Sequence, residues 1–149
     1  MGQKDAAEKL LEDYPDVFAD IVNVLLFHGE EMVKAEDLQE TGLQSQYKAN
    51  DGNLHEQERD VAKYWTRGNV KIALYGLENQ TMEDRDMPLR IMNYDGASYR
   101  SQLLKGSKER YPVISLVLYY GSEEWKAPLT LHEALDIPDG LKPYVSDYR

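Results

Sequence analysis

Apolar residues along the chain follow two patterns, helical spacing near the N-terminus and continuous runs farther on. The N-terminal apolar positions recur every three or four residues on both sides of Tyr14-Pro15, and they continue to Leu26. This spacing is typical of the buried face of a helix, and Gly favours the left-handed position that ends one. We therefore expect two N-terminal helices, of which the second ends at His28-Gly29.

Two later stretches have the continuous apolar character of strands inside a sheet. Residues 70–77 (VKIALYGL) and 111–120 (YPVISLVLYY) are rich in apolar and β-branched side chains. Such runs are typical of strands covered on both faces. Residues 59–66 fit either a strand or a helix, and the turn signal at Gly68-Asn69 would join them to residues 70–77 as a hairpin if they form a strand.

The remaining elements are two predicted helices and a polar connection. Thr130 and Glu133 have the spacing of a capping box, which predicts a short helix after them. Residues 34–57 are polar, and we expect a surface connection there. Asp86 is the expected N-cap of a longer helix whose core-facing positions follow at spacings of three and four: Leu89, Met92, Gly96, Tyr99 and Leu103. The order of elements predicts an α/β fold with a mixed sheet.

Composition excludes several classes of protein and site. The chain has 149 residues, no cysteine and 3 histidines, which lie far apart in the sequence. Disulfides, thiolate sites and cysteine nucleophiles are therefore excluded, and zinc is not expected. No apolar run reaches the ~20 residues of a membrane span and the N-terminus lacks a signal-peptide core, so we expect a cytoplasmic protein without a membrane partner.

The net charge of −10 argues against a nucleic-acid partner until its distribution is considered. Residues 1–58 carry 14 acidic and 4 basic side chains, whereas residues 59–110 carry 7 acidic and 10 basic ones. The acidic surplus is therefore confined to the N-terminal part. Charged stretches are usually solvated surfaces, so this asymmetry permits a DNA partner without requiring one.

Glu78 and Gln80 form a candidate site at the end of an apolar strand. Alternate residues of a strand point to the same face, so these two side chains should lie together, with Asn79 on the other face. Asp60 would meet Glu78 if residues 59–66 pair with residues 70–77. Two carboxylates suit Mg²⁺ or Mn²⁺, and a bound ion could activate water for hydrolysis while Gln80 orients it.

Several stretches in order along nearly the whole chain resemble the Rpn-like family of recombination-promoting, transposase-related nucleases within the PD-(D/E)XK superfamily. The stretches are Phe18-Ala19-Asp20, Arg59-Asp60-Val61, Leu77-Glu78-Asn79-Gln80, Met87-Pro88-Leu89-Arg90, Tyr94-Asp95, and Tyr111-Pro112-Val113 through Tyr120-Gly121 with Trp125. The resemblance implies a restriction-endonuclease-like fold, a mixed sheet flanked by helices. It also implies that Asp60 and Glu78 are catalytic metal ligands and that Gln80, in place of the superfamily's usual lysine, is the third catalytic residue.

Further expectations follow from the resemblance. Asp20 on an N-terminal helix, Arg90 and Asp95 are supporting candidates, and the implied activity is metal-dependent hydrolysis of DNA in recombination. We expect residues 1–149 to form one nuclease-like domain that lacks a C-terminal part of the family, and a homodimer remains open. Lys63, Arg67, Lys71 or Arg90 would contact phosphates.

Two other interpretations stay open at this point. The net charge of −10 and the glutamine at position 80 are also compatible with an inactive nuclease-fold remnant that acts as an interaction module. A plain α/β domain that binds a protein through its acidic N-terminal half would need no catalytic site at all.

Overall fold

The break at Tyr14-Pro15 separates two helices in the computed structural model, which describes residues 3–41, 46–48, 54–56, 60–106 and 108–149. Helix α1 covers Gln3–Asp13 and α2 covers Pro15–Phe27. Pro15 is the first residue of α2, where a missing backbone N–H leaves no hydrogen bond unmade. At the other end His28 adopts a left-handed φ of 55° and the N–H of Gly29 bonds to the carbonyl of Asn23 at 2.9 Å. The predicted helix pair is confirmed.

Four strands form the main sheet in the order β1-β4-β5-β6. β1 and β4 are antiparallel, β4 and β5 are antiparallel, and β5 and β6 are parallel, so the sheet is mixed as predicted. A separate two-stranded sheet joins β2 and β3. The strands are β1 (Leu38–Glu40), β2 (Gln46–Lys48), β3 (Leu54–Glu56), β4 (Val61–Arg67), β5 (Val70–Gln80) and β6 (Val113–Tyr119).

The β4–β5 hairpin settles the ambiguity of residues 59–66, whose described part is a strand. Arg67 pairs with Val70 across a two-residue turn, and Gly68 has a φ of 61°, which favours glycine. Residues 34–57 were expected to form only a surface connection. In their described part, the 3₁₀ helix η1 (Ala35–Asp37) and β1 correct that expectation, because even a polar segment can supply an edge strand when its backbone pairs with β4.

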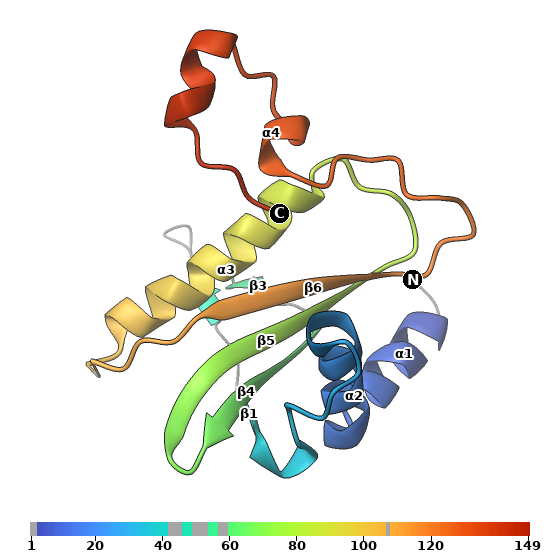
Figure 1. The fold of residues 1–149 in the computed structure, drawn as a ribbon, viewed down its shortest axis with the longest axis vertical. Helices are drawn as coiled ribbons and strands as arrows, with labels where there is room; N and C mark the ends of the chain where they lie inside the picture. The colour runs from blue at the N-terminus through green and yellow to red at the C-terminus, as the bar shows by residue number, and fades with distance from the viewer. Residues whose placement is uncertain (1–2, 42–45, 49–53, 57–59, 107) are drawn as a thin grey trace.

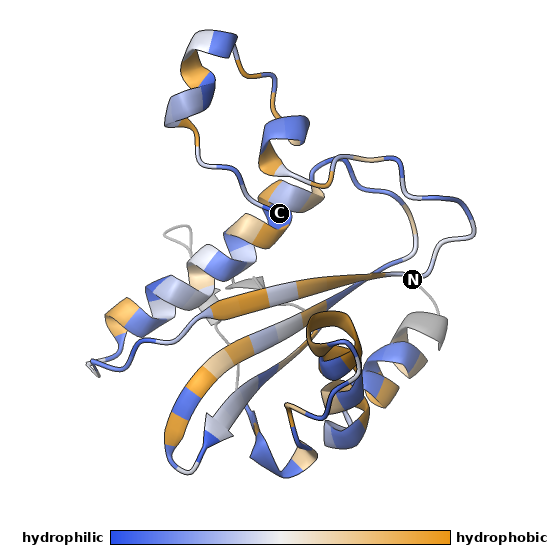
Figure 2. Ribbon diagram, in the orientation of Figure 1, coloured by the Kyte–Doolittle hydropathy of each residue, from blue (hydrophilic) through white to orange (hydrophobic). Residues whose placement is uncertain are grey.

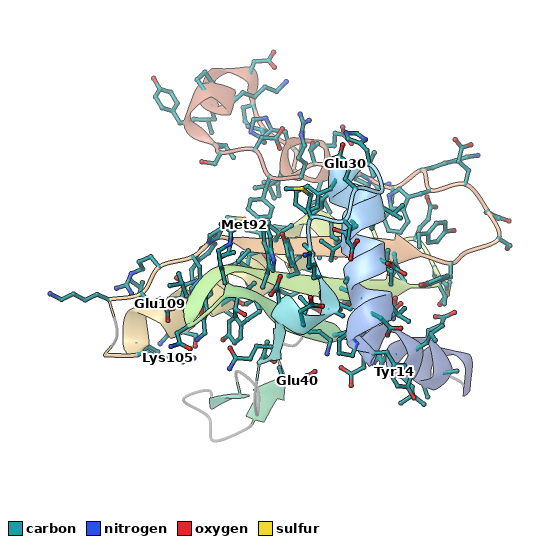
Figure 3. All side chains as sticks on the ribbon, turned by 60° about the horizontal axis from the view of Figure 1, so that its bottom comes forward. Tyr14, Glu30, Glu40, Met92, Lys105 and Glu109 are labelled. Carbon is teal, nitrogen blue, oxygen red and sulfur yellow. The ribbon has the colours of Figure 1, made fainter. Side chains whose placement is uncertain are left out.

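Helices cover both faces of the sheet (Figure 1). α2 crosses the strands on one face (Figure 3), where its Phe18 and Val22 pack with Tyr75 and Leu77 of β5. Side chains alternate along β5, so Leu74 points to the opposite face and packs there in a second cluster. Helix α3 (Met87–Leu104) lies on that second face and connects β5 to the parallel strand β6.

The expected core-facing side of α3 is wrong. Leu89, Met92, Tyr99 and Leu103 are 39%, 44%, 42% and 70% exposed, and Gly96 is exposed as well. The buried residues of α3 are Met87, Pro88, Ile91, Asp95 and Gln102. Two of them, Asp95 and Gln102, are polar and make hydrogen bonds on the side of the helix that faces the sheet. Hydrophobic spacing could not reveal this orientation, because hydrogen bonds from those polar side chains fix it.

The C-terminal segment returns to α3. A short helix α4 (Leu131–Ala134) begins at Thr130, whose hydroxyl accepts the N–H of Glu133 at 3.2 Å, as the capping-box spacing predicts. The 3₁₀ helix η2 (Asp139–Tyr144) follows and projects from the rest of the molecule (Figure 1). The chain then passes α4 again, and the Tyr148 hydroxyl donates to Asp95. Within the described ranges, no helix has both the length and the apolar character to cross a membrane.

Candidate active site

Asp60 and Glu78 lie beside each other at one end of the sheet. Val61 pairs with Leu77 in the antiparallel β4–β5 ladder, so Asp60 before β4 comes next to Glu78 of β5. The Asp60 Oδ2 atom accepts the backbone N–H of Asn79 at 2.7 Å, which fixes this carboxylate against the end of β5. The hairpin thus joins two acidic residues that are distant in sequence.

Glu78 is a buried carboxylate with one unsatisfied oxygen. Its residue is 5% exposed, and its Oε1 atom lies 2.6 Å from Nη2 of Arg90. Its Oε2 atom is buried and has no hydrogen-bond partner among the residues that the structure describes. Burial raises the pKa of Glu78 to about 7, the charge of Asp60 adds to this shift, and Arg90 opposes it. The unsatisfied oxygen marks a position where a cation or a proton would be stabilised.

Arg90 holds two carboxylates through the two ends of its guanidinium. Nη2 bonds to Glu78 and Nη1 lies 2.7 Å from Oδ2 of Asp84, while Tyr94 on the next helical turn accepts from Nη2 at 3.2 Å. Partial burial would lower the pKa of Arg90, but the hydrogen bonds to Asp84 and Tyr94 outweigh it, so the pKa lies above its ordinary value. This permanent cation positions Glu78 from the α3 side.

On the other face of β5, Asn79 connects the strand to α1. Its Nδ2 atom donates to Oε2 of Glu12 at 2.8 Å, and the Tyr120 hydroxyl donates to Oε1 of the same carboxylate at 3.0 Å. Glu12 is only 3% exposed, and burial together with the charges of Asp60 and Glu8 raises its pKa. Asn79 therefore contacts two carboxylates, Asp60 through its backbone and Glu12 through its side chain.

Lys9 supplies a second cation. Its Nζ atom lies 2.8 Å from Oδ1 of Asp60, and its side chain is 48% exposed. Lys9 and Glu12 are three positions apart on α1, so one helical face carries both to the site. The pair Lys9–Asp60 mirrors the pair Arg90–Glu78, and each carboxylate of the β4–β5 end has a cationic partner.

The other predicted site residues occupy three different places. Gln80 ends β5 on the same face as Glu78, and it is half-buried. Asp20 is exposed on α2, whereas Glu12 of α1 is buried. Asp95 is buried on α3 but accepts hydrogen bonds from Ser115 at 2.5 Å and from Tyr148. Its contacts hold β6 and the C-terminal segment to α3.

Most of the side chains that were expected to contact phosphates lie away from the candidate site. Lys63 is fully buried on the α2 side, where its Nζ atom pairs with Asp13 and Glu40, so it cannot contact DNA. Arg67 and Lys71 lie at the hairpin turn, and Lys71 is about 23 Å along β5 from Glu78 by strand geometry. Only Arg90, among the four proposed cations, lies at the candidate site.

Lys9 and Glu12 are the site residues that the sequence did not reveal. Both lie on α1, a short polar helix that has the appearance of a solvated segment. Their spacing of three was visible, but nothing in the sequence indicated that this helix would pack against the end of β5. A charged residue in such a polar helix gives no sequence signal that it is buried.

The donor atoms at this site fit a divalent ion of the Mg²⁺ type. Carboxylate oxygens are its preferred protein ligands, and Mg²⁺ usually binds one or two carboxylates and keeps several waters. Asp60 and Glu78 provide such a pair, and the Oε2 atom of Glu78 is buried without a partner in the described part of the chain. Among the described residues, no group of three or more acidic or histidine side chains is assembled as a complete metal site.

Comparison with known proteins identifies the family. A family model described as "Putative transposase, YhgA-like" matches residues 30–149, a range that includes Asp60, Glu78, Gln80 and Arg90 but not α1. No curated protein and no solved structure gives a significant match to the chain. Because the matched range extends over most of the sequence, the chain belongs to the YhgA-like transposase family.

Proposed function

We propose that this protein is a divalent-metal-dependent endonuclease that hydrolyses DNA phosphodiester bonds, in line with the PD-(D/E)XK resemblance of its sequence. The observation that carries the proposal is the adjacent pair Asp60 and Glu78, together with the buried, unsatisfied Oε2 atom of Glu78. A buried carboxylate oxygen without a donor is unfavourable unless a cation or a proton occupies its side. Membership of a transposase family agrees with a reaction on DNA.

Asp60 and Glu78 would hold Mg²⁺ or Mn²⁺. A bound divalent ion would supply charge stabilisation for the phosphodiester and lower the pKa of an attacking water. Gln80, on the same face as Glu78, would orient that water by hydrogen bonding, because an amide offers both a donor and an acceptor. Asn79 keeps Asp60 in position through its N–H, so it is a positioning residue.

The two cations of the site have separate roles in this proposal. Lys9 has a side chain 48% exposed and contacts Asp60, so it can move to a phosphate when Asp60 binds metal. Arg90 is anchored by Asp84 and would hold Glu78 in place throughout. These two residues partly neutralise the carboxylates of Asp60 and Glu78, which lowers the electrostatic repulsion of a DNA strand at the site.

Cleavage of a supercoiled plasmid tests the proposal. The wild type should nick or linearise the DNA with Mg²⁺ or Mn²⁺ but not with a chelator, and Asp60→Asn and Glu78→Gln should each lose the activity. Glu30→Gln is the matched control, because Glu30 is an exposed acidic residue beyond the end of α2. Cleavage that persists in the Asp60 and Glu78 variants would overturn the assignment of this site.

A second candidate function is an interaction module without catalysis. It is favoured by the two ion pairs Lys9–Asp60 and Arg90–Glu78, which give each carboxylate a cationic partner without any metal. The same assay separates the candidates, provided that metal binding is measured in parallel. A folded protein that binds neither Mg²⁺ nor Mn²⁺ and leaves DNA intact would support the interaction module.

A further inference from the structure

Two loops beyond the ends of β5 and β6 lie next to the candidate site, and together they will be called the rim. Residues 81–86 lead from β5 to α3, and residues 120–130 lead from β6 to α4. Glu83 joins the loops, because its Oε1 atom accepts the backbone N–H of Ala127 at 2.8 Å and also that of Lys126. Figure 1 shows both loops beyond the same end of the sheet, and Figure 2 shows that they are mainly hydrophilic. The β6–α4 loop is therefore held beside the site.

An aromatic pair, Tyr119 and Trp125, lies at the rim on the same face of the sheet as Glu78. In the parallel β5–β6 ladder Val117 pairs with Glu78 and Tyr119 pairs with Gln80, so the Tyr119 side chain lies beside Gln80. By strand geometry the Cα atoms of Tyr119 and Glu78 are about 8 Å apart. Trp125 packs against the Tyr119 ring with a centroid distance of 5.1 Å and an interplanar angle of 77°. Both residues are half-buried, so each keeps part of its surface open to solvent.

The position of the Tyr119 ring depends on Gly121. A Cβ atom at residue 121 would overlap the hydroxyl end of that ring, so a residue without a side chain leaves room for it. The Tyr119 ring in turn supports Trp125 from one side. Ordering a side chain on binding costs free energy, so a stacking site for a base gains affinity when its rings are already held in place. The aromatic pair meets this condition.

The indole N–H of Trp125 lacks a hydrogen-bond acceptor. Its Nε1 atom is buried, and no acceptor among the described residues bonds to it. Buried polar groups in proteins are nearly always hydrogen-bonded, so this donor indicates a missing partner. Nucleobases and phosphates carry acceptor oxygens, and a nucleotide that shifts the half-buried indole on binding would supply one.

We propose that Tyr119 and Trp125 form a base-stacking subsite, which takes an unpaired base of a single DNA strand next to the phosphodiester bond that is cleaved. The inference rests on the proposed function and names a substrate class within it, single-stranded rather than duplex DNA. Aromatic side chains stack the bases of single strands with little regard to sequence. In a duplex the bases stack on one another, so a base has to be unstacked before a protein ring can take its face.

The charges of the rim also favour a single strand. Its exposed charged residues are Glu83, Arg85, Asp86, Glu123, Glu124 and Lys126, so acidic side chains outnumber basic ones. Duplex DNA carries one negative charge per about 1.7 Å of its length, and a single strand carries about half that density. The rim therefore repels a duplex more strongly than a single strand. Stacking on an aromatic ring needs no cation at the rim, so it is compatible with this acidic surface.

Binding of a single-stranded oligothymidylate of about 16 nucleotides, measured in a chelator, tests the subsite without any cleavage. The wild type should bind this strand more tightly than the same strand annealed to its complement. Trp125→Ala should weaken binding of the single strand at least about fivefold, and Trp125→Phe, which keeps an aromatic face, should restore most of the affinity. Tyr144→Ala is the matched control, because Tyr144 is an 85% exposed aromatic residue on η2, and it should bind as the wild type does.

Tryptophan fluorescence shows whether the base contacts Trp125. The chain has two tryptophans, and Trp65 packs with Phe27 and Tyr75 in the core. In Trp65→Phe, the emission of Trp125 should fall as oligothymidylate is added, which a purely structural tryptophan would not show. If Trp65→Phe does not fold, a fall in wild-type emission that Trp125→Phe lacks supports the same contact. Unchanged emission at saturating oligonucleotide overturns the proposal.

The subsite and the nuclease proposal fail in different ways. Binding of the single strand through Trp125 without metal-dependent cleavage would contradict the nuclease and support the base-binding subsite. Metal-dependent cleavage together with unchanged affinity in Trp125→Ala would contradict the subsite and support the nuclease. A wild type that binds the duplex as tightly as the single strand, or that does not bind the single strand, also overturns the subsite.

Discussion

Arg90 of α3 reaches Glu78 of β5 with its Nη2 atom 2.6 Å from Oε1, and this ion pair ties the helix to the sheet at the candidate site. Glu78 is 5% exposed, so its negative charge depends on this guanidinium. The Asp84 carboxylate fixes the other side of Arg90 at 2.7 Å, which leaves the cation little freedom to turn away. Arg90 thus holds the buried Glu78 in place, and Asp84 in turn holds Arg90.

Arg90→Ala should destabilise the protein mainly at alkaline pH. Removal of one partner of a buried pair usually costs about 3–5 kcal/mol, but the Arg90 side chain is 36% exposed, so we expect about 1–2 kcal/mol at pH 8. The loss should be smaller at pH 5, where Glu78, with a pKa of about 7, is protonated and needs no cation. Urea unfolding in a chelator measures both values.

The exposed neighbour Arg85 provides the control for that experiment. Arg85→Ala should change the unfolding free energy by less than about 0.5 kcal/mol at either pH, as surface substitutions usually do. An Arg90→Ala variant that loses equal stability at pH 5 and pH 8 would show that the Arg90 contact to Glu78 is not the source of the effect.

Glu78→Gln should remove the part of the pH dependence of stability that comes from Glu78. The pKa of Glu78 is about 7 in the folded protein against an ordinary value of 4.5, so the native state binds more protons than the unfolded state between these values. Stability contributed by Glu78 is therefore present at low pH and is lost as pH rises through that window. As the pH rises from 4 to 8 without metal, the unfolding free energy of the variant should therefore increase relative to that of wild type by on the order of 2–3 kcal/mol.

Glu30→Gln, which removes an exposed carboxylate, is the control for the titration, and its curve should run parallel to that of the wild type. The same unfolding series, repeated at several pH values in a chelator, provides the comparison. A difference between Glu78→Gln and wild type that stays constant with pH would show that Glu78 keeps an ordinary pKa in the folded state.

Divalent ions should stabilise the wild type more strongly at pH 8 than at pH 5.5. At the lower pH, protons compete for the Glu78 carboxylate, whose pKa is about 7. A ligand at ten times its dissociation constant stabilises the native state by about 1.4 kcal/mol, which a thermal shift would detect. Asp60→Asn should abolish the shift with Mg²⁺ and Mn²⁺. A shift of equal size in wild type and variant would place the ion elsewhere.

Glu12 should matter through its hydrogen bonds more than through its charge. Glu12→Ala removes the acceptors of Asn79 and Tyr120 and should cost about 1–3 kcal/mol, whereas Glu12→Gln keeps an acceptor for Asn79 and should stay within about 1 kcal/mol of wild type at pH 7. Burial raises the pKa of Glu12, so a neutral side chain is well accommodated there. Chemical unfolding of the two variants tests the contrast, and equal losses would contradict it.

Periodicity predicted the main helices and the strands over residues 70–77 and 111–120, but not the edge strand β1 or how the elements face one another. The break at Pro15, the Gly68-Asn69 turn and the buried strand over residues 70–77 depend on local backbone preferences, which are legible in the sequence. Because Val61 pairs with Leu77 in the hairpin, Asp60 and Glu78 are neighbours. These parts needed no knowledge of long-range packing.

The orientation of α3 and the role of α1 depend on contacts that the sequence does not display. Gln102 turns toward the sheet because its side chain bonds to the N–H and the carbonyl of Tyr111 at 3.2 and 3.0 Å, and apolar spacing carries no trace of this. Glu12 is buried only because Asn79 and Tyr120 meet it from two separate strand ends. Polar side chains with long-range partners are the features that the sequence does not reveal.

Lys63 provides the last test, because its position separates a structural cation from a DNA-binding one. Its side chain is fully buried and pairs with Asp13 and Glu40, whose own side chains are 60% and 67% exposed and can remain hydrated without it. Lys63→Met should therefore lie within about 1 kcal/mol of wild type, whereas Lys63→Ala should lose about 2–4 kcal/mol through the cavity that it leaves. Urea unfolding gives both values. DNA affinity at low salt should be unchanged in Lys63→Met and reduced in Lys9→Met, and the opposite order would return Lys63 to the DNA-binding surface.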